Sequence, residues 1–148
     1  MELNLLFSLA NLYVIPLWMI MIFLPQWGLT QRIMKSYLPF IPLILLYIYL
    51  FAISLNPESA AVLSNPRLED LSSIFSQNPV AFAAWVHFLV VDLFLGRYIY
   101  WQGQNENILT THSLILCLFA GPIGLLSHIL TRYIQFSLMP KVNTSDGK

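Results

Sequence analysis

The fold is decided by residues 80–100, which read VAFAAWVHFLVVDLFLGRYIY. Asp92 and Arg97 are the only charged residues in this run. A helix needs about 20 predominantly apolar residues to cross the hydrocarbon core of a bilayer, and this run has that length. Because backbone in lipid must satisfy its own hydrogen bonds, we expect residues 80–100 to form a transmembrane helix.

Three further apolar stretches lie to either side of this run, at residues 3–24, 38–55 and 109–130. Each approaches or reaches the length of a membrane-spanning helix, and none shows the strict alternation of a barrel strand. The sequence therefore predicts an all-α, polytopic membrane protein with four transmembrane helices. An even number of spans would leave both termini on one side of the membrane.

The composition excludes several other classes of protein. Hydrophobic residues make up 57% of the 148-residue chain and charged residues only 9%, with seven Lys and Arg balancing seven Asp and Glu. A soluble domain typically carries about 25% charged residues. An ordinary soluble enzyme, a disordered chain and a nucleic-acid-binding protein are therefore excluded. Membrane lipid is the expected surrounding, and a single cysteine, Cys117, excludes an intramolecular disulfide.

The longest connection, residues 56–78, predicts a short amphipathic helix lying in the membrane interface. Asn65 and Pro66 are typical of an N-cap and a first helical residue. Four apolar residues then follow at helical spacing: Leu68, Leu71, Ile74 and Phe75. The alternative is a plain loop. We expect residues 1–137 to form one four-helix domain and residues 138–148 a polar tail.

Asp92 is the first candidate for a chemical role. A carboxylate near the bilayer centre costs roughly 2.5–3.5 kcal/mol on insertion scales, so such a residue usually faces the bundle interior with a partner. It could act as a catalytic acid or base, or orient a ligand. Alternatively, it could form a structural hydrogen bond that fixes helix packing.

His87 is the second catalytic candidate, five residues before Asp92. Five residues turn a helix by about 140°, so the two side chains do not share a face. They could still bracket one ligand between neighbouring helices. The alternative for His87 is a hydrogen-bonded packing residue.

Six further residues are candidates for contacts with a bound molecule. Trp85, Phe88, Tyr98 and Trp101 could contact an apolar ligand, although each alone also fits packing or an interfacial aromatic belt. Arg97 and His112 fall near the same membrane face and could bind a polar end-group. As a flanking charge, Arg97 could instead snorkel to the interface.

Small residues recur along one side of the stretch at 109–130, namely Ser113, Cys117, Gly121 and Gly124. Such a stripe lets membrane helices approach closely, and we expect it to pack against the helix at 80–100. Pro122 removes a backbone donor and predicts a kink.

No motif indicates a metal or a cofactor. The three histidines lack metal-ligand spacing, and the Glu-x-x-His pattern of di-iron bundles is absent. We therefore expect neither a metal nor a cofactor.

Three segments together carry a resemblance to a known family. Residues 84–97 read AWVHFLVVDLFLGR, residues 121–125 read GPIGL, and the first helix contains Ala10-Asn11-Leu12 and Pro16-Leu17-Trp18. Over about residues 4–135 the chain resembles the abscisic-acid-deficient family of membrane proteins. Plant members are chloroplast proteins needed to make neoxanthin from violaxanthin, and cyanobacteria carry short relatives.

The resemblance implies a role in xanthophyll metabolism in a thylakoid or other cyanobacterial membrane, or in a chloroplast membrane. The implied reaction is a cofactor-independent isomerisation in which one epoxide opens and a polyene carbon loses a proton to give an allene. It needs a base at that carbon and an acid at the epoxide oxygen, for which the matching positions offer His87 and Asp92.

Two non-enzymatic alternatives remain open. A small four-helix protein could be a pigment-binding subunit or assembly factor of a photosynthetic membrane complex. It could also line a proton or ion pathway, which would require a homo-oligomer.

Overall fold

The computed structural model describes residues 2–138, and all regular structure in this part of the chain is helical, as expected. The helices are α1 (Leu3–Phe23), α2 (Gly28–Lys35), a 3-10 turn η1 (Leu38–Phe40), α3 (Ile41–Ser54), α4 (Pro57–Ser64), α5 (Leu68–Phe75), α6 (Asn78–Glu106), α7 (Thr111–Phe119) and α8 (Gly121–Leu138). Apart from Leu138, the expected polar tail at 138–148 lies outside the described residues.

Two of these helices, α1 and α6, are long and apolar enough to cross a membrane. A third span would consist of α2 together with Leu38–Ser54, two segments bent by 68° against each other. The first three apolar stretches of the sequence are therefore confirmed as helices, and they support two or three spans.

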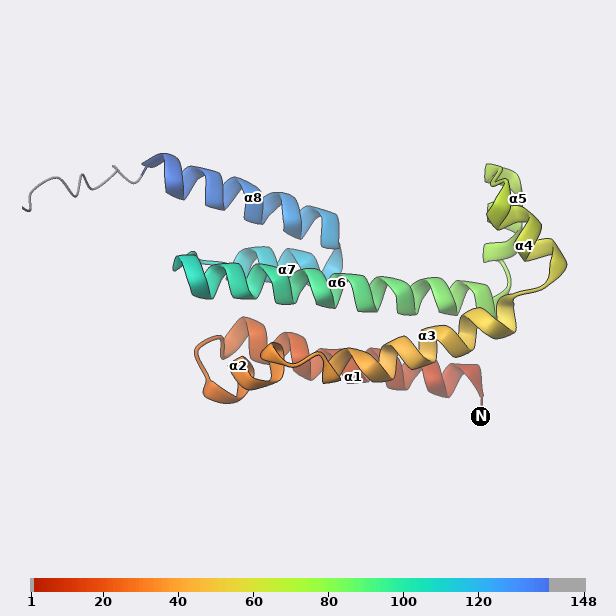
Figure 1. Ribbon diagram of the computed structural model, residues 1–148, viewed down its shortest axis with the longest axis horizontal. Coiled ribbons are helices and arrows are strands. Elements are labelled where there is room, and N and C mark those ends of the chain that lie inside the picture. The colour runs from red at the N-terminus through yellow and green to blue at the C-terminus, as the bar shows by residue number, and fades with distance from the viewer. Residues whose placement is uncertain (1, 139–148) are drawn as a thin grey trace, which may run out of the picture.

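The core of the bundle lies where α1 and α3 pack on α6, side by side along much of their length (Figure 1). Leu50 of α3 and Met21 of α1 are both fully buried. Gly96 permits the close approach of α1, because a Cβ at this position would lie 2.5 Å from the ring of Trp18. The long helix α6 is therefore the element on which the rest of the molecule is arranged.

The fourth predicted span is not formed. The stretch at 109–130 breaks at Ala120 into α7 and α8, which fold back on each other as an antiparallel hairpin (Figure 1). Hydrogen bonds link Ser113 to Ser127 at 3.1 Å and His112 to Thr131 at 2.8 Å. The N-terminal end of α1 and the C-terminal end of α8 consequently lie at opposite ends of the bundle, contrary to the four-span prediction.

The physical reason for this reversal lies in the small residues. A Cβ on Gly124 would come within 2.5 Å of the Cβ and the backbone N of Cys117, so only glycine allows α8 to lie this close to α7. The small residues expected to pack against α6 therefore also allow α8 to pack on α7. Next to Pro122, where a kink was expected, the chain reverses its direction.

The connection between α3 and α6 forms two short helices where one was predicted. The expected amphipathic helix is confirmed as α5. Asn65, however, is the C-cap of the additional helix α4 and not the N-cap of α5, so that part of the prediction is wrong. A reciprocal capping box between Asn56 and Ser59, with Pro57 in the first turn, begins α4.

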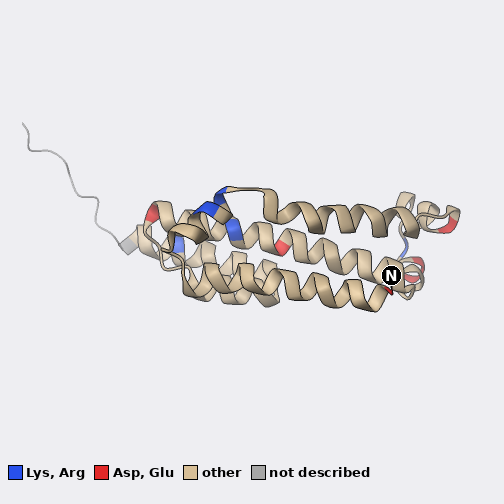
Figure 2. Ribbon diagram, turned by 90° about the horizontal axis from the view of Figure 1, so that it is seen from below, with Lys and Arg blue, Asp and Glu red and all other residues tan. Residues whose placement is uncertain are grey.

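Most Lys and Arg residues gather towards one end of the molecule and most Asp and Glu residues towards the other (Figure 2). The end formed by α2, the C-terminal part of α6 and the C-terminal part of α8 carries Arg32, Lys35, Arg97 and Arg132, together with Glu106. The other end, with α4, α5 and the start of α1, carries Glu2, Glu58, Glu69 and Asp70, together with Arg67. We call these the basic end and the acidic end.

Candidate functional site

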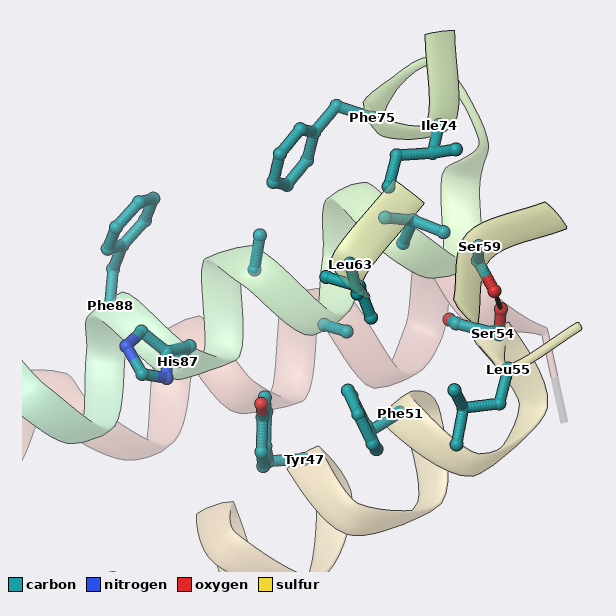
Figure 3. A pocket seen from close by; sticks show the side chains of 13 residues that line it. Tyr47, Phe51, Ser54, Leu55, Ser59, Leu63, Ile74, Phe75, His87 and Phe88 are labelled. Carbon is teal, nitrogen blue, oxygen red and sulfur yellow. Dashed lines mark hydrogen bonds between the residues drawn. The ribbon is translucent and has the colours of Figure 1, made fainter. Parts of the chain in front are cut away.

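A cavity of about 290 Å³ lies near the acidic end, between α3, α4, α5 and α6 (Figure 3). Its wall is almost entirely apolar and includes Phe51 from α3, Leu63 from α4 and Phe75 from α5. The helix α6 contributes Ala84, His87 and Phe88. We call this space the α3–α6 cavity. Its shape and lining suit an apolar ring rather than a charged molecule.

Few polar groups reach this cavity. The hydroxyl of Ser54 donates to the carbonyl of Leu50 at 2.7 Å, and the hydroxyl of Ser59 donates to the carbonyl of Ser54 at 2.9 Å. The His87 imidazole packs beside the ring of Tyr47, with 5.8 Å between the ring centroids. His87 and Tyr47 are therefore the polar side chains of the wall best placed to meet a bound molecule.

Asp92 lies elsewhere and faces the hairpin of α7 and α8. The Asp92 carboxylate lies directly against Gly121, because a Cβ at this glycine would come within 2.0 Å of Asp92 Oδ1. The thiol of Cys117 donates to the backbone carbonyl of Asp92 at 3.5 Å. Because a carboxylate interacts favourably with the positive end of a helix, Asp92 stabilises the start of α8. Asp92 was predicted to have either a chemical or a structural role. The structure supplies a contact for the structural role, at the start of α8.

The two predicted catalytic residues are thus not brought together. His87 faces α3, whereas Asp92 faces the tip of the α7–α8 hairpin, as the 140° between them on α6 requires. The cavity lined by His87 does not include Asp92. The prediction that they bracket one ligand is not supported by this geometry.

Arg97 and Trp101 hold the C-terminal end of α2. The Arg97 Nε donates to the carbonyl of Met34 at 2.5 Å, and the Trp101 indole donates to the same carbonyl at 3.0 Å. The guanidinium also lies 4.4 Å from the ring centroid of Tyr37. Both side chains satisfy carbonyls that a helix end leaves free, so their surroundings are those of structural residues.

The other predicted contact residues are dispersed. Phe88 lines the α3–α6 cavity, as expected of a ligand contact. The Trp85 indole donates to the side-chain oxygen of Asn11 on α1 at 2.9 Å. His112 lies on the α7–α8 hairpin. Trp85 also lines a cavity of about 390 Å³ between α1 and α6, and Tyr98 lines another between α6 and α8.

This second cavity, of about 530 Å³, lies between α6 and α8 near the basic end. Tyr98 and Gln102 from α6 and His128 and Arg132 from α8 supply its polar groups. Arg132 forms an ion pair with Glu106 at 2.6 Å. We call this space the α6–α8 cavity. It is markedly more polar than the α3–α6 cavity.

Sequence reasoning missed several lining residues. Tyr47 and Phe75 belong to different segments of the chain, and nothing in their spacing shows that both line the cavity that His87 borders. Gln102 lies beyond the apolar run at 80–100 that predicts the helix, whereas α6 continues to Glu106. Among the described residues, no group of three His, Cys, Asp or Glu side chains could hold a metal ion.

The chain belongs to the ABA DEFICIENT 4-like family, whose family model matches residues 5–128. A relative from Arabidopsis thaliana, Protein ABA DEFICIENT 4, chloroplastic, is 36% identical over 133 residues. The match covers 86% of this chain and 60% of the relative, so the chain spans less than two thirds of that protein. No solved structure matches the chain.

Proposed function

We propose that this protein acts in xanthophyll metabolism, as an isomerase that binds one end ring of an epoxy-carotenoid in the α3–α6 cavity. The observation that carries the proposal is an apolar, ring-sized cavity with a single imidazole in its wall. Membership of the ABA DEFICIENT 4-like family supports the substrate class through the resemblance described above. The chloroplastic relative and the apolar helices support a chloroplast membrane as its location.

The chemistry requires one base and one acid. His87 takes the proton from the polyene carbon next to the ring, and the Tyr47 hydroxyl donates its proton to the oxygen as the epoxide C–O bond breaks. The C–H bonding electrons become the new double bond of the allene. Transfer of the proton from His87 back to Tyr47 then restores both side chains, so no oxidant, reductant or cofactor is consumed.

The position of the cavity suits this role. It lies near the acidic end of the bundle, beside the last turn of α3 and under the short helices α4 and α5. A carotenoid is about as long as the ~30 Å hydrocarbon core of a bilayer, so its end ring lies near an interface. Asp92, held against Gly121, has no part in the proposed proton transfer.

The test is conversion of violaxanthin by the purified protein in lipid nanodiscs, with the product separated by chromatography. We expect His87→Phe and Tyr47→Phe to abolish conversion while the pigment stays bound, since both substitutions retain an aromatic ring. Tyr49→Phe is the matched control, because Tyr49 also lies on α3 but is 53% exposed and outside the cavity. It should convert normally.

The same assay separates the alternatives. If the unaltered protein retains violaxanthin without converting it, the non-enzymatic pigment-binding function replaces the isomerase. If conversion occurs and His87→Phe leaves its rate unchanged, the role of His87 is wrong. If violaxanthin neither binds nor is converted, the proposal that a carotenoid is the ligand is wrong.

A further inference from the structure

The two cavities lie on one face of α6. Residues 84 and 88 border the α3–α6 cavity, and residues 98 and 102 border the α6–α8 cavity. Steps of three and four residues connect these positions through Val91 and Leu95, which is the spacing of one helix face. Much of the face between the cavities is open, because Phe88 is 57% exposed, Val91 46% and Tyr98 46%, while Leu95 is partly buried beside Gly121.

The length of this face matches an extended molecule. Ala84 and Gln102 are eighteen residues apart within α6, which at 1.5 Å per residue corresponds to about 27 Å. That is close to the ~30 Å thickness of the hydrocarbon core and hence to the length of a carotenoid. A molecule with one end in the α3–α6 cavity would therefore bring its other end to the α6–α8 cavity.

The α6–α8 cavity has the groups needed to bind a hydroxyl or epoxide oxygen. His128 Nε2 and Gln102 Oε1 are 2.7 Å apart, and since an amide oxygen only accepts, the histidine donates. Gln102 Nε2 in turn donates to the Tyr98 hydroxyl oxygen at 2.6 Å. This chain of hydrogen bonds leaves the Tyr98 O–H free to donate to a ligand.

His128 adds a second, independent observation. Its side chain lines the same cavity and is only 1% exposed, and its Nδ1 has no hydrogen-bond partner among the described residues. With the proton on Nε2, Nδ1 is an acceptor. A buried polar atom without a partner is costly, and a hydroxyl group bound in the adjoining cavity would offset that cost.

We infer that the α6–α8 cavity is a second subsite, which binds the oxygenated far end of the same extended carotenoid whose near ring lies beside His87. This inference rests on the proposed function. Its occupant is a polyene with a polar group at each end, lying along Phe88, Val91 and Leu95. With the two ends held at different sites, one ring reacts in each binding event while the other is kept away from His87.

The experiment measures binding to the protein in nanodiscs by quenching of tryptophan fluorescence. The probes are a full-length carotenoid with a hydroxyl on each ring and a truncated carotenoid with one such ring and half of the polyene. We expect Tyr98→Phe to weaken binding of the full-length probe about 2–10-fold, the effect of one lost hydrogen bond. The truncated probe, which cannot reach from one cavity to the other, should show the same affinity for both proteins.

A second variant tests whether the volume of the α6–α8 cavity is needed for binding. Leu125→Trp should fill part of this cavity, which Leu125 lines, and weaken binding of the full-length probe further. Tyr49→Phe again serves as the control and should bind both probes normally. Thermal unfolding of each variant verifies that the fold is retained.

The outcomes distinguish this inference from the proposed function. If the full-length probe binds and violaxanthin is converted, but Tyr98→Phe and Leu125→Trp change nothing, the second subsite is wrong and the proposed function stands. An equal loss of affinity for both probes would also overturn the subsite, because it would indicate a general defect. If neither probe binds the unaltered protein, the subsite and the proposed function both fail.

Discussion

The carboxylate of Asp92 lies where the chain reverses between α7 and α8, and this position determines what its substitution should do. Asp92→Ala removes the carboxylate that lies against Gly121 at the positive end of α8 and should lower the free energy of unfolding by about 0.3–1 kcal/mol. Asp92→Asn keeps a side-chain oxygen at the same place and should cost less. Thermal unfolding in detergent measures both changes.

The rate of violaxanthin conversion tests whether Asp92 also has a catalytic role. Because Asp92 faces away from the α3–α6 cavity, Asp92→Asn should convert the pigment at the rate of the unaltered protein. A stable Asp92→Asn protein without activity would instead make Asp92 the catalytic group and contradict the assignment to His87.

Arg97 offers a second prediction for a single residue. Arg97→Met removes one of the two donors to the carbonyl of Met34, since Trp101 remains, and a charge near the C-terminal end of α2. Since hydrogen bonds to charged groups contribute about 1.5–3 kcal/mol, the loss of stability should be of that order. Arg32→Met is the control, because Arg32 is exposed on α2 itself, and it should stay within about 0.5 kcal/mol. Equal effects of the two substitutions would show that Arg97 does not anchor α2.

At the scale of elements, the α7–α8 hairpin depends on Gly124. Gly124→Ala would place a methyl group 2.5 Å from the Cα and the backbone N of Cys117, and backbone cannot move aside as a flexible side chain can. We expect the hairpin to open and stability to fall by about 1–3 kcal/mol. Gly28→Ala is the matched control, because an added Cβ there meets nothing within 4 Å. It should unfold at or slightly above the temperature of the unaltered protein. A Gly124→Ala protein of undiminished stability would contradict the close packing of α7 on α8.

The hairpin also shows which elements a sequence can predict. The helices at 3–24, 38–55 and 80–100 follow from apolar length alone, since lipid leaves an apolar segment few alternatives to a helix. The reversal at Ala120 depends on contacts between residues distant in the chain, above all Asp92 with Gly121. Apolar length cannot distinguish a crossing helix from such a hairpin. The helix α4, by contrast, has a local sequence signal, because Asn56 and Ser59 form a capping box around Pro57 in the first turn.

The candidate site was predictable only in part, for the same reason. His87 and Phe88 stood out because they lie in one apolar run, and they do border a cavity. Their neighbours Tyr47 and Phe75 come from α3 and α5, and only the packing of these helices on α6 brings them near. Arg97 and Trp101 looked like ligand contacts in the sequence, and the position of α2 gives them structural hydrogen bonds instead.

At the scale of the whole molecule, the reversal between α7 and α8 brings the C-terminal part of α8 back to the basic end and so changes the distribution of charge. With four spans, Arg132 would lie on the side opposite Arg97, and orientation would be undecided. In the structure Arg132 pairs with Glu106 at the basic end, so the described residues place four Lys and Arg there, Arg32, Lys35, Arg97 and Arg132, against Arg67 at the acidic end. The positive-inside rule then predicts that the basic end faces the cytoplasm when the protein is inserted into a bacterial inner membrane.

Labelling of single cysteines with a membrane-impermeant maleimide tests this orientation. In a Cys117→Ala background, Gln104→Cys and Ser137→Cys mark the basic end and Glu2→Cys marks the acidic end. We expect Glu2→Cys to react from outside intact spheroplasts, and the other two to react only after the membrane is opened. Four crossing helices would instead make Ser137→Cys react together with Glu2→Cys, because α8 would then end on the side where α1 begins. Reaction of Gln104→Cys and Ser137→Cys from outside, with Glu2→Cys protected, would retain the hairpin but reverse the predicted orientation.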